Sequence, residues 1–184
     1  MAHYRRAFVP GGTFFFTVVT FERRPILATA VARRLLGRAI RATRRDRPFD
    51  VVALVLLPDH LHTIWTLPRG DNDFSTRWQV LKMRFTRDLL RAGWESAAAS
   101  RSRRGRGEQE VWQRRFWEHR VRDEDDLRRH MDYVHWNPVK HGQVRRVIEW
   151  PWSTFHRYVR LGVYPPDWGA HEPLAGIELT TSGE

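Results

Sequence analysis

The sequence contains no cysteine, and its apolar runs are short. Without cysteine the chain forms no disulfides, thiolate zinc sites or cysteine nucleophiles, a composition that fits a reducing compartment. The longest uninterrupted apolar run, residues 51–57, is far too short to cross a bilayer. No extended apolar stretch of the signal-peptide type precedes Pro10-Gly11-Gly12. We therefore expect a cytoplasmic protein that does not contact a membrane.

Acidic residues are also scarce. The chain has 21 Asp and Glu against 32 Lys and Arg, which gives a formal net charge of +11 over 184 residues. Arginine supplies nearly all of the positive charge, and its guanidinium pairs with phosphate in a fork geometry. A small protein this basic is expected to bind a polyanion, with nucleic acid as the leading candidate. The alternative is a basic surface that serves solubility alone.

The remaining composition is that of a folded protein. Hydrophobic residues make up 41% of the chain and nine residues are tryptophan, which is enough for the core of one domain. Alternation and β-branched or aromatic residues predict four strands, over residues 13–20, 51–57, 60–67 and 111–122. Apolar residues at helical spacing predict three helices, over residues 27–45, 75–92 and 123–136.

Two features predict where these elements stop. Asn137 precedes Pro138, and a residue before proline is pushed out of the α region, so the third helix is expected to end near residue 136. Residues 96–110 lack large apolar side chains and are expected to form a flexible basic loop. We predict one domain over residues 1–158, containing this loop, and a C-terminal tail over residues 159–184.

The triplet His60-Leu61-His62 opens the third predicted strand. Successive side chains of a strand point to opposite faces, so the two histidines share one face while Leu61 anchors the strand from behind. Two imidazoles on one side of a central strand make a partial metal site with room for other ligands. The alternative is that both histidines serve packing or ordinary hydrogen bonding.

The third predicted helix carries a polar stripe that could complete such a site. Asp126, His130, Tyr133 and Asn137 recur at helical spacing, beside an apolar face. Tyr133 and Asn137 are four residues apart, so they can reach the same cation. Together with the histidine pair they suggest a metal-assisted tyrosine nucleophile for DNA. The alternatives are an ordinary amphipathic helix with Tyr133 at its boundary, and Asn137 as a helix C-cap.

Four segments resemble the REP-associated tyrosine transposases, relatives of the single-tyrosine HUH transposases of bacterial insertion sequences. The segments are GGTFFFTVVTFERRPIL, VVALVLLPDHLHTIWTLP, WQRRFWEHRVRDEDDLRRHMDYVHWNPVKHGQV and WPWSTFHRYV. The resemblance covers residues 7–158, which is most of the chain. Its most specific part is a His-hydrophobe-His triplet followed, at the right distance, by Tyr-x-x-x-Asn-Pro-Val-Lys-His-Gly.

The resemblance implies an α+β fold with a ferredoxin-like antiparallel sheet and helices packed on it. It also implies that His60 and His62 are metal ligands, that Tyr133 is the nucleophile and that Asn137 completes the coordination. The matching families cut single-stranded DNA beside a hairpin, forming a 5′-phosphotyrosine link and leaving a 3′-OH. By the same resemblance the substrate is hairpin DNA of the repetitive extragenic palindromic (REP) type, and a monomer is favoured although a dimer is possible.

Attack of a tyrosine oxygen on a DNA phosphate needs assistance. Tyrosine is a poor nucleophile at its free pKa of about 10, so it needs help with deprotonation and an electrophile activated by a cation. Two neutral imidazoles and an amide oxygen give a site of moderate affinity that leaves positions for phosphate and water. We expect the cation to be Mg²⁺ or Mn²⁺.

Basic side chains are candidates for contacts with DNA phosphates, although solvated surface is the alternative for any one of them. Besides the arginines of the first predicted helix, the candidates are Arg5, Arg6, Lys82, Arg114, Arg115, Lys140, Arg145 and Arg146. Tryptophans could stack unpaired bases, but we expect most of them to be packed in the core.

Two other functions stay open. One is a protein that binds hairpin DNA or RNA without cutting it, and the other is a metal-dependent nuclease that uses water, with Tyr133 only structural. A transposase built on three carboxylates is disfavoured because the acidic residues show no paired arrangement. The roles of Asp59 and His130 are undecided, as is whether the tail covers the site. For a DNA-processing enzyme we expect a bacterial, nucleoid-associated location.

Overall fold

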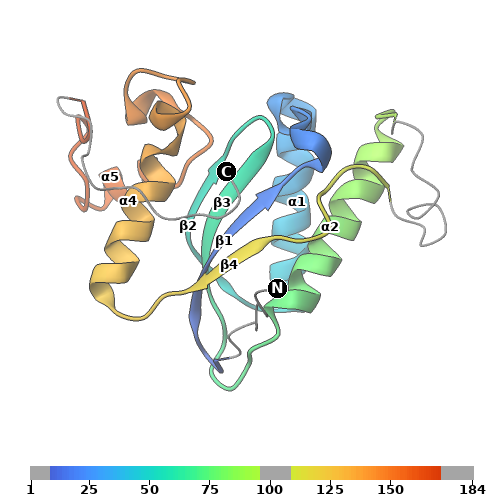
Figure 1. The fold of residues 1–184 in the computed structure, drawn as a ribbon, viewed down its shortest axis with the longest axis horizontal. Helices are drawn as coiled ribbons and strands as arrows, with labels where there is room; N and C mark the ends of the chain where they lie inside the picture. Colours follow the sequence, from blue (N-terminus) through green and yellow to red (C-terminus); the bar gives the residue numbers. More distant parts are fainter. Residues whose placement is uncertain (1–8, 96–108, 171–184) are drawn as a thin grey trace, which may run out of the picture.

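The computed structural model describes residues 9–95 and 109–170, and it contains one four-stranded antiparallel sheet (Figure 1). The strand order is β2-β3-β1-β4. The strands are β1 (Thr13–Val19), β2 (Asp50–Leu56), β3 (His60–Thr66) and β4 (Trp117–Arg120). The helices are α1 (Ala30–Asp46), α2 (Phe74–Arg91), α4 (Glu124–Lys140) and α5 (Phe155–Arg160). Three short 3₁₀ turns complete the description: η1 (Phe21–Arg23), η2 (Ile26–Ala28) and η3 (Val147–Glu149).

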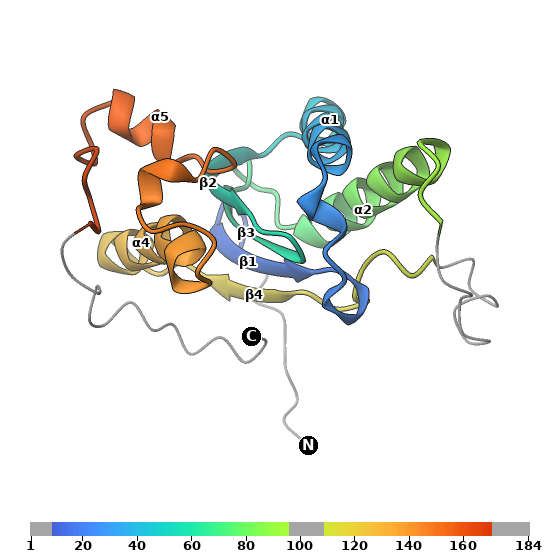
Figure 2. The same ribbon diagram turned by 90° about the horizontal axis from the view of Figure 1, so that it is seen from above.

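The helices lie in two layers, one on each face of the sheet (Figure 2). Alternation in β1 explains this arrangement, because Phe14 and Phe16 pack in the core under α1 and α2 whereas Phe15 packs against α4. All three phenylalanines are fully buried. The expected α+β fold, an antiparallel sheet with helices packed on it, is confirmed.

Strand β3 lies inside the sheet, between β2 and β1. Leu61 and Trp65 point to the core beneath α1 and α2, as the alternation of the sequence predicts. Ile64 points to the opposite face, towards α4. His60 and His62 therefore lie on the α4 side of the sheet, and both are buried.

Three predicted boundaries were wrong. Helix α1 begins at Ala30 rather than at residue 27, because the residues before it form the separate turn η2. Helix α4 does not end near residue 136 but continues through Pro138 to Lys140. A proline removes only its own N–H from the ladder, and the amides that follow still bond, with His141 N donating to Asn137 O at 3.0 Å. The fourth strand covers only its predicted C-terminal end, since Trp112 forms an isolated bridge to Thr20 outside β4.

The segment after α4 covers the free edge of β2. The amide of Leu56 donates to Trp152 O at 2.9 Å, and the amide of Thr154 donates to Leu54 O at 2.8 Å. Beyond α5, Tyr164 packs in a third hydrophobic cluster against the side of α4. Figure 2 shows this orange and red part of the chain beside α4 and β2.

Several predictions fall on residues outside the described ranges. These are Arg5, Arg6, most of the basic loop (residues 96–108) and the end of the tail (residues 171–184). The domain boundary at residue 158 stays a prediction. In the part of the chain that the structure describes, none of the helices combines the length and apolarity that crossing a bilayer requires.

Candidate active site

His60, the first residue of β3, is fixed by the carboxylate of Asp59. Its Nδ1 lies 2.6 Å from Asp59 Oδ1, and because an ionised carboxylate only accepts, Nδ1 carries the proton. Burial alone would raise the pKa of Asp59, but the hydrogen bonds and charges of His60 and Arg23 outweigh it and lower that pKa to about 2. In the neutral tautomer with this proton, Nε2 of His60 carries the lone pair. This atom is buried and bonds to none of the described residues.

His62 stands two residues further along β3, on the same face. Its Nδ1 lies 2.9 Å from Oγ1 of Thr17, the residue opposite it on β1. A threonine hydroxyl can accept from Nδ1, and that tautomer leaves Nε2 as the lone-pair nitrogen that a metal needs. The ring centroids of His60 and His62 are 4.9 Å apart. The two imidazoles therefore form one compact pair.

Asn137 lies on the face of α4 that is turned to this pair. One turn before Asn137, the ring centroid of Tyr133 lies 5.2 Å from that of His62. One turn after Asn137, the ring centroid of His141 lies 5.1 Å from that of His60. Its side chain is fully buried, yet neither Oδ1 nor Nδ2 has a hydrogen-bond partner in residues 9–95 and 109–170. An unsatisfied buried amide costs roughly 1–3 kcal/mol, so this position suits a bound group.

These donors fit a divalent cation. A carboxylate that orients a histidine, as Asp59 orients His60, is the usual support for a metal-binding imidazole. An amide oxygen is a ligand that Mg²⁺ and Mn²⁺ accept. Two specific observations match a metal site: within the described part of the chain, neither Nε2 of His60 nor the side-chain amide of Asn137 has a hydrogen-bond partner.

Tyr133 is 1% exposed and lies against the histidine pair. Its ring meets Phe15 edge-on at 5.9 Å and His62 edge-on at 5.2 Å, which fixes its direction. The ammonium of Lys140 donates to its phenolic oxygen at 3.3 Å and lies 4.9 Å from its ring centroid. A cation this close favours the negatively charged phenolate over the phenol.

Sequence reasoning missed part of this environment. Lys140 was predicted only as a DNA contact, although it lies on the Tyr133 side of α4, seven residues further on. No sequence pattern points to His141, the C-cap of α4, and none decides the role of Asp59. A spacing of seven residues places Lys140 and Tyr133 on the same face of a helix. The sequence did not indicate this contact because the helix was expected to end near residue 136, before Lys140.

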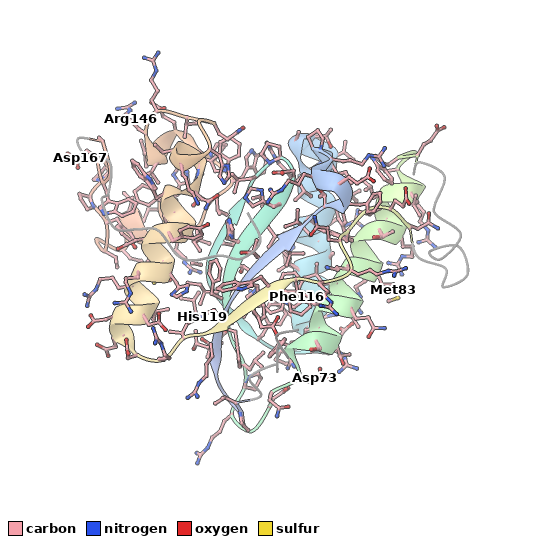
Figure 3. All side chains as sticks on the ribbon, in the orientation of Figure 1. Asp73, Met83, Phe116, His119, Arg146 and Asp167 are labelled. Carbon is pink, nitrogen blue, oxygen red and sulfur yellow. The ribbon has the colours of Figure 1, made fainter. Side chains whose placement is uncertain are left out.

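A second polar group lies nearby, around the buried carboxylate of Asp126. His119 Nε2 donates to Asp126 Oδ2 at 2.9 Å, and His130 Nδ1 donates to the backbone oxygen of Asp126 at 2.7 Å. Figure 3 shows His119 on β4, on the side of α4. The donor atoms of the three residues lie within 4.8 Å of one another and could hold a metal ion.

The bonding around Asp126 favours a structural role over a metal site. Arg122 donates to Asp126 Oδ2 through both its amide and its Nε, each at 3.0 Å, so a cation would have to displace these donors. Burial would raise the pKa of Asp126, but the hydrogen bonds from Arg122 and His119 hold it well below its usual range. The group thus ties β4 to the first turn of α4. The predicted polar stripe faces the sheet, and its members are buried.

Replacing Asp126 with asparagine is expected to lower the free energy of unfolding by about 2 kcal/mol, because it weakens several charge-assisted hydrogen bonds. Since the pKa of Asp126 is lowered in the fold, its contribution is present above the unfolded pKa of about 4 and is lost as the pH falls. Urea unfolding at pH 7 and at low pH measures both effects. Asp125→Asn, which affects only the exposed pair with Arg128, is the matched control. Equal loss in the two variants would contradict the structural role.

The predicted DNA contacts that fall in the described residues lie in several separate places. Lys82 lies on α2, where its ammonium donates to Gln113 O at 2.9 Å. Arg145 and Arg146 are exposed after α4, on the opposite side of the sheet, and Arg146 pairs with Glu149 at 2.8 Å. Arg114 and Arg115 are exposed in the segment before β4. A DNA molecule bound at Tyr133 would therefore meet these residues in separate groups.

Comparison with known proteins bears on this arrangement. No family model matches the chain. The REP-associated tyrosine transposase of Escherichia coli (strain K12) is 47% identical over 168 residues, 91% of each chain. A Haemophilus influenzae protein of the same family name is 42% identical over 174 residues, 95% of this chain and 97% of that one.

A solved structure agrees with these relatives. The structure of a REP-associated tyrosine transposase bound to a REP hairpin matches with a TM-score of 0.77 and 44% identity, covering 98% of this chain and 100% of that chain. The identity, the coverage and the shared fold lead to one conclusion. This chain belongs to the family of REP-associated tyrosine transposases.

Proposed function

We propose that the protein is a single-stranded DNA endonuclease and strand transferase that acts beside hairpin-forming REP-like palindromes, with Tyr133 as the nucleophile. The observation that carries the proposal is the position of the Tyr133 phenol, which lies against the His60 and His62 pair while the Lys140 ammonium reaches its oxygen. A tyrosine with a purely structural role in the core would need neither the cation nor the imidazoles.

The proposed reaction exchanges one phosphodiester for another. The phenol of Tyr133 loses its proton to water, and its oxygen attacks the phosphorus. The bond from phosphorus to the 3′ oxygen breaks, and that oxygen takes a proton from water to become a 3′-OH. The product is a 5′-phosphotyrosine. Because the new bond keeps the energy of the old one, a 3′-OH can attack it in turn and release Tyr133, which is strand transfer.

In this proposal His60, His62 and Asn137 hold Mg²⁺ or Mn²⁺, which when bound would neutralise charge on the scissile phosphate and make it more electrophilic. The protein's own residues do the rest. Asp59 and Thr17 set the tautomers of the two histidines, and Phe15 fixes the Tyr133 ring. Lys140 stabilises the phenolate before attack and, after the link is formed, lies beside the phosphate oxygens.

The partner in this proposal is single-stranded DNA that folds into a hairpin, bound by a monomer, and the location is cytoplasmic at the nucleoid. Support comes from the +11 charge and from the family member whose structure holds a REP hairpin.

The test mixes the protein with labelled hairpin DNA and Mn²⁺ and looks for DNA-linked protein on a denaturing gel. Free cleavage products without such a band would indicate a water nucleophile. Tight binding with no cleavage would indicate a non-catalytic hairpin-binding protein.

Replacing Lys140 with methionine is expected to slow adduct formation by roughly 10- to 100-fold at neutral pH, because the phenolate loses its neighbouring cation. Hairpin affinity and its salt dependence should change little. If Lys140 is instead mainly a phosphate contact, affinity falls and the slope of log Kd against log salt concentration drops by about one. Single-turnover rates and binding titrations, with Lys140→Arg as the charge-preserving control, distinguish the two roles.

A further inference from the structure

A groove separate from the candidate active site lies between α1 and the segment that covers the β2 edge. Its volume is about 460 Å³, and its floor is formed by Leu54 and Leu56 of β2. One wall is the arginine-rich side of α1, and the other includes Trp152. The groove therefore combines an apolar floor, an aromatic side chain and a row of positive charges.

The arginines of this wall are Arg34, Arg38 and Arg41, which follow one side of α1 at spacings of four and three residues. All three are exposed, and none of them forms an ion pair or hydrogen bond with a residue in the described ranges. Like charges at such spacing repel one another. By contrast, Arg44 and Arg45 on the same helix pair with Asp50 and Asp46. The groove side of α1 thus concentrates positive charge that no acidic residue of the described ranges neutralises.

Gly37 also lines the groove, in the middle of α1. A glycine in a helix interior costs about 1 kcal/mol relative to alanine. A Cβ added at this position would lie 3.4 Å from Nη1 of Arg41, and it would approach no other described atom within 4 Å apart from the adjacent residues and the backbone of α1. The space beside Gly37 is therefore open except for an arginine head, and a larger side chain there would fill the groove.

The Trp152 wall is held firmly. Arg33 stacks its guanidinium over Trp152 at 4.8 Å and over Trp150 at 5.4 Å, while its Nε donates to Leu27 O at 2.7 Å. Trp152 itself is only partly buried. A fixed, partly exposed aromatic ring beside a row of cations is the arrangement with which proteins bind unpaired nucleotides, by stacking bases and neutralising the backbone.

The groove lies on the α1 side of the sheet, and one end of it is at the same end of the β2-β3 hairpin as His60. Trp150 Nε1 donates to Leu56 O at 2.9 Å, and Leu56 lies four residues before His60 on the same hairpin. The amide of Leu27, just before α1, donates to Pro58 O at 2.8 Å. The N-terminal end of α1 and the His60 end of the hairpin are thus adjacent. From there the arginines from Arg34 to Arg41 extend about 10 Å along the helix axis.

We propose that this groove binds single-stranded DNA flanking the hairpin, with phosphates on Arg34, Arg38 and Arg41 and a base against Trp152. A strand that leaves the site at Tyr133 around the His60 end of the hairpin meets Trp152 first and the arginines next. The inference rests on the proposed function, because it takes DNA as the substrate. It adds a site for the unpaired flank, on the α1 edge of the sheet.

The test compares two DNA ligands and three variants by fluorescence anisotropy at several salt concentrations. The ligands are a REP-like hairpin without flanks and the same hairpin with unpaired extensions on both sides. The first variant replaces Arg34, Arg38 and Arg41 with glutamine. The matched control replaces three other arginines with glutamine. These are Arg44, Arg45 and Arg87, which are also exposed but pair with acidic residues. The third, Gly37→Leu, fills the groove without changing the charge.

We expect the first variant to bind the flanked hairpin at least 10-fold more weakly, with a slope of log Kd against log salt concentration reduced by about two. The unflanked hairpin should bind as before. Gly37→Leu should weaken binding of the flanked hairpin alone, with the salt slope unchanged, and the control should bind both ligands like the unmodified protein. Thermal unfolding checks that every variant is folded.

Unchanged affinity of the first variant for the flanked hairpin would overturn the proposal, and so would an equal loss for both ligands, which would indicate contact with the hairpin itself. A different measurement tests the proposed function. If that function is wrong, the unmodified protein forms no covalent adduct at saturating DNA. An intact adduct with unchanged flank binding would reject the groove alone.

Discussion

Tyr133→Phe is expected to abolish the covalent protein–DNA adduct and to lower hairpin cleavage by roughly 1000-fold or more, as removal of a nucleophile does in other enzymes that act through a covalent intermediate. The change removes one hydroxyl and keeps the ring that packs on Phe15 and His62. Hairpin affinity and thermal stability should therefore stay close to those of the unmodified protein. Denaturing gels with labelled DNA measure the adduct, and anisotropy measures the binding.

The matched control is Tyr158→Phe. Tyr158 lies on α5, and its hydroxyl donates to Val52 O at 2.7 Å, away from the histidine pair. This variant should form the adduct at a normal rate. If Tyr133→Phe still cuts DNA while leaving a free 5′ phosphate, the nucleophile is water and Tyr133 is a packing residue. If Tyr158→Phe loses the adduct instead, the nucleophile has been assigned to the wrong helix.

The second large effect is expected at the histidine pair. His60→Ala or His62→Ala should lower adduct formation by at least roughly 100-fold, because each change removes one of the proposed donors to the divalent cation. A readout besides activity is available, since a cation that binds only the folded state raises its unfolding temperature. Mn²⁺ should raise the unfolding temperature of the unmodified protein and have little effect on either variant.

His156→Ala serves as the control for these substitutions. His156 lies on α5 and bonds through Nε2 to Trp150 O at 2.9 Å, outside the candidate site. Its loss should leave both the Mn²⁺ effect and the adduct in place. A Mn²⁺ effect that survives in His60→Ala but disappears in His119→Ala would place the cation at the Asp126 group. The proposed ligand set would then be wrong.

The sheet that carries the site could be predicted from the sequence because its strands depend on local pattern. Residues 13–20, 51–57 and 60–67 were each predicted within one residue of β1, β2 and β3. The same alternation placed Leu61 behind the two histidines, as the structure confirms. These features need no knowledge of distant contacts, since a residue's parity in the strand decides which face it takes.

The features that sequence reasoning missed depend on tertiary contacts. The rule for Asn137 and Pro138 is local, but packing of the buried Pro138 and the bonds that follow it outweighed that rule and extended α4 to Lys140. Only this extension places the ammonium of Lys140 on Tyr133. The polar stripe of α4 was expected at the border of the core. It is buried, because Asp126 and His130 find partners on β4 and within α4 itself.

Exposed arginines were the hardest to place. Their positions in sequence show that the surface is basic, but not which ones are already neutralised by carboxylates. Arg44 and Arg34 look alike in the sequence, yet only the first has an acidic partner among the described residues. That difference separates the groove side of α1 from the rest of the helix.

The most direct measurement of the central claim is the site of covalent attachment. The adduct formed with 5′-flanked hairpin DNA and Mn²⁺ is digested with protease and nuclease, and the modified peptide is identified by mass spectrometry. The proposed mechanism predicts a nucleotide attached through its 5′ phosphate to the oxygen of Tyr133, and a free 3′-OH on the released strand. Attachment to another residue, or cleavage in which no peptide carries a nucleotide, would contradict the proposed mechanism.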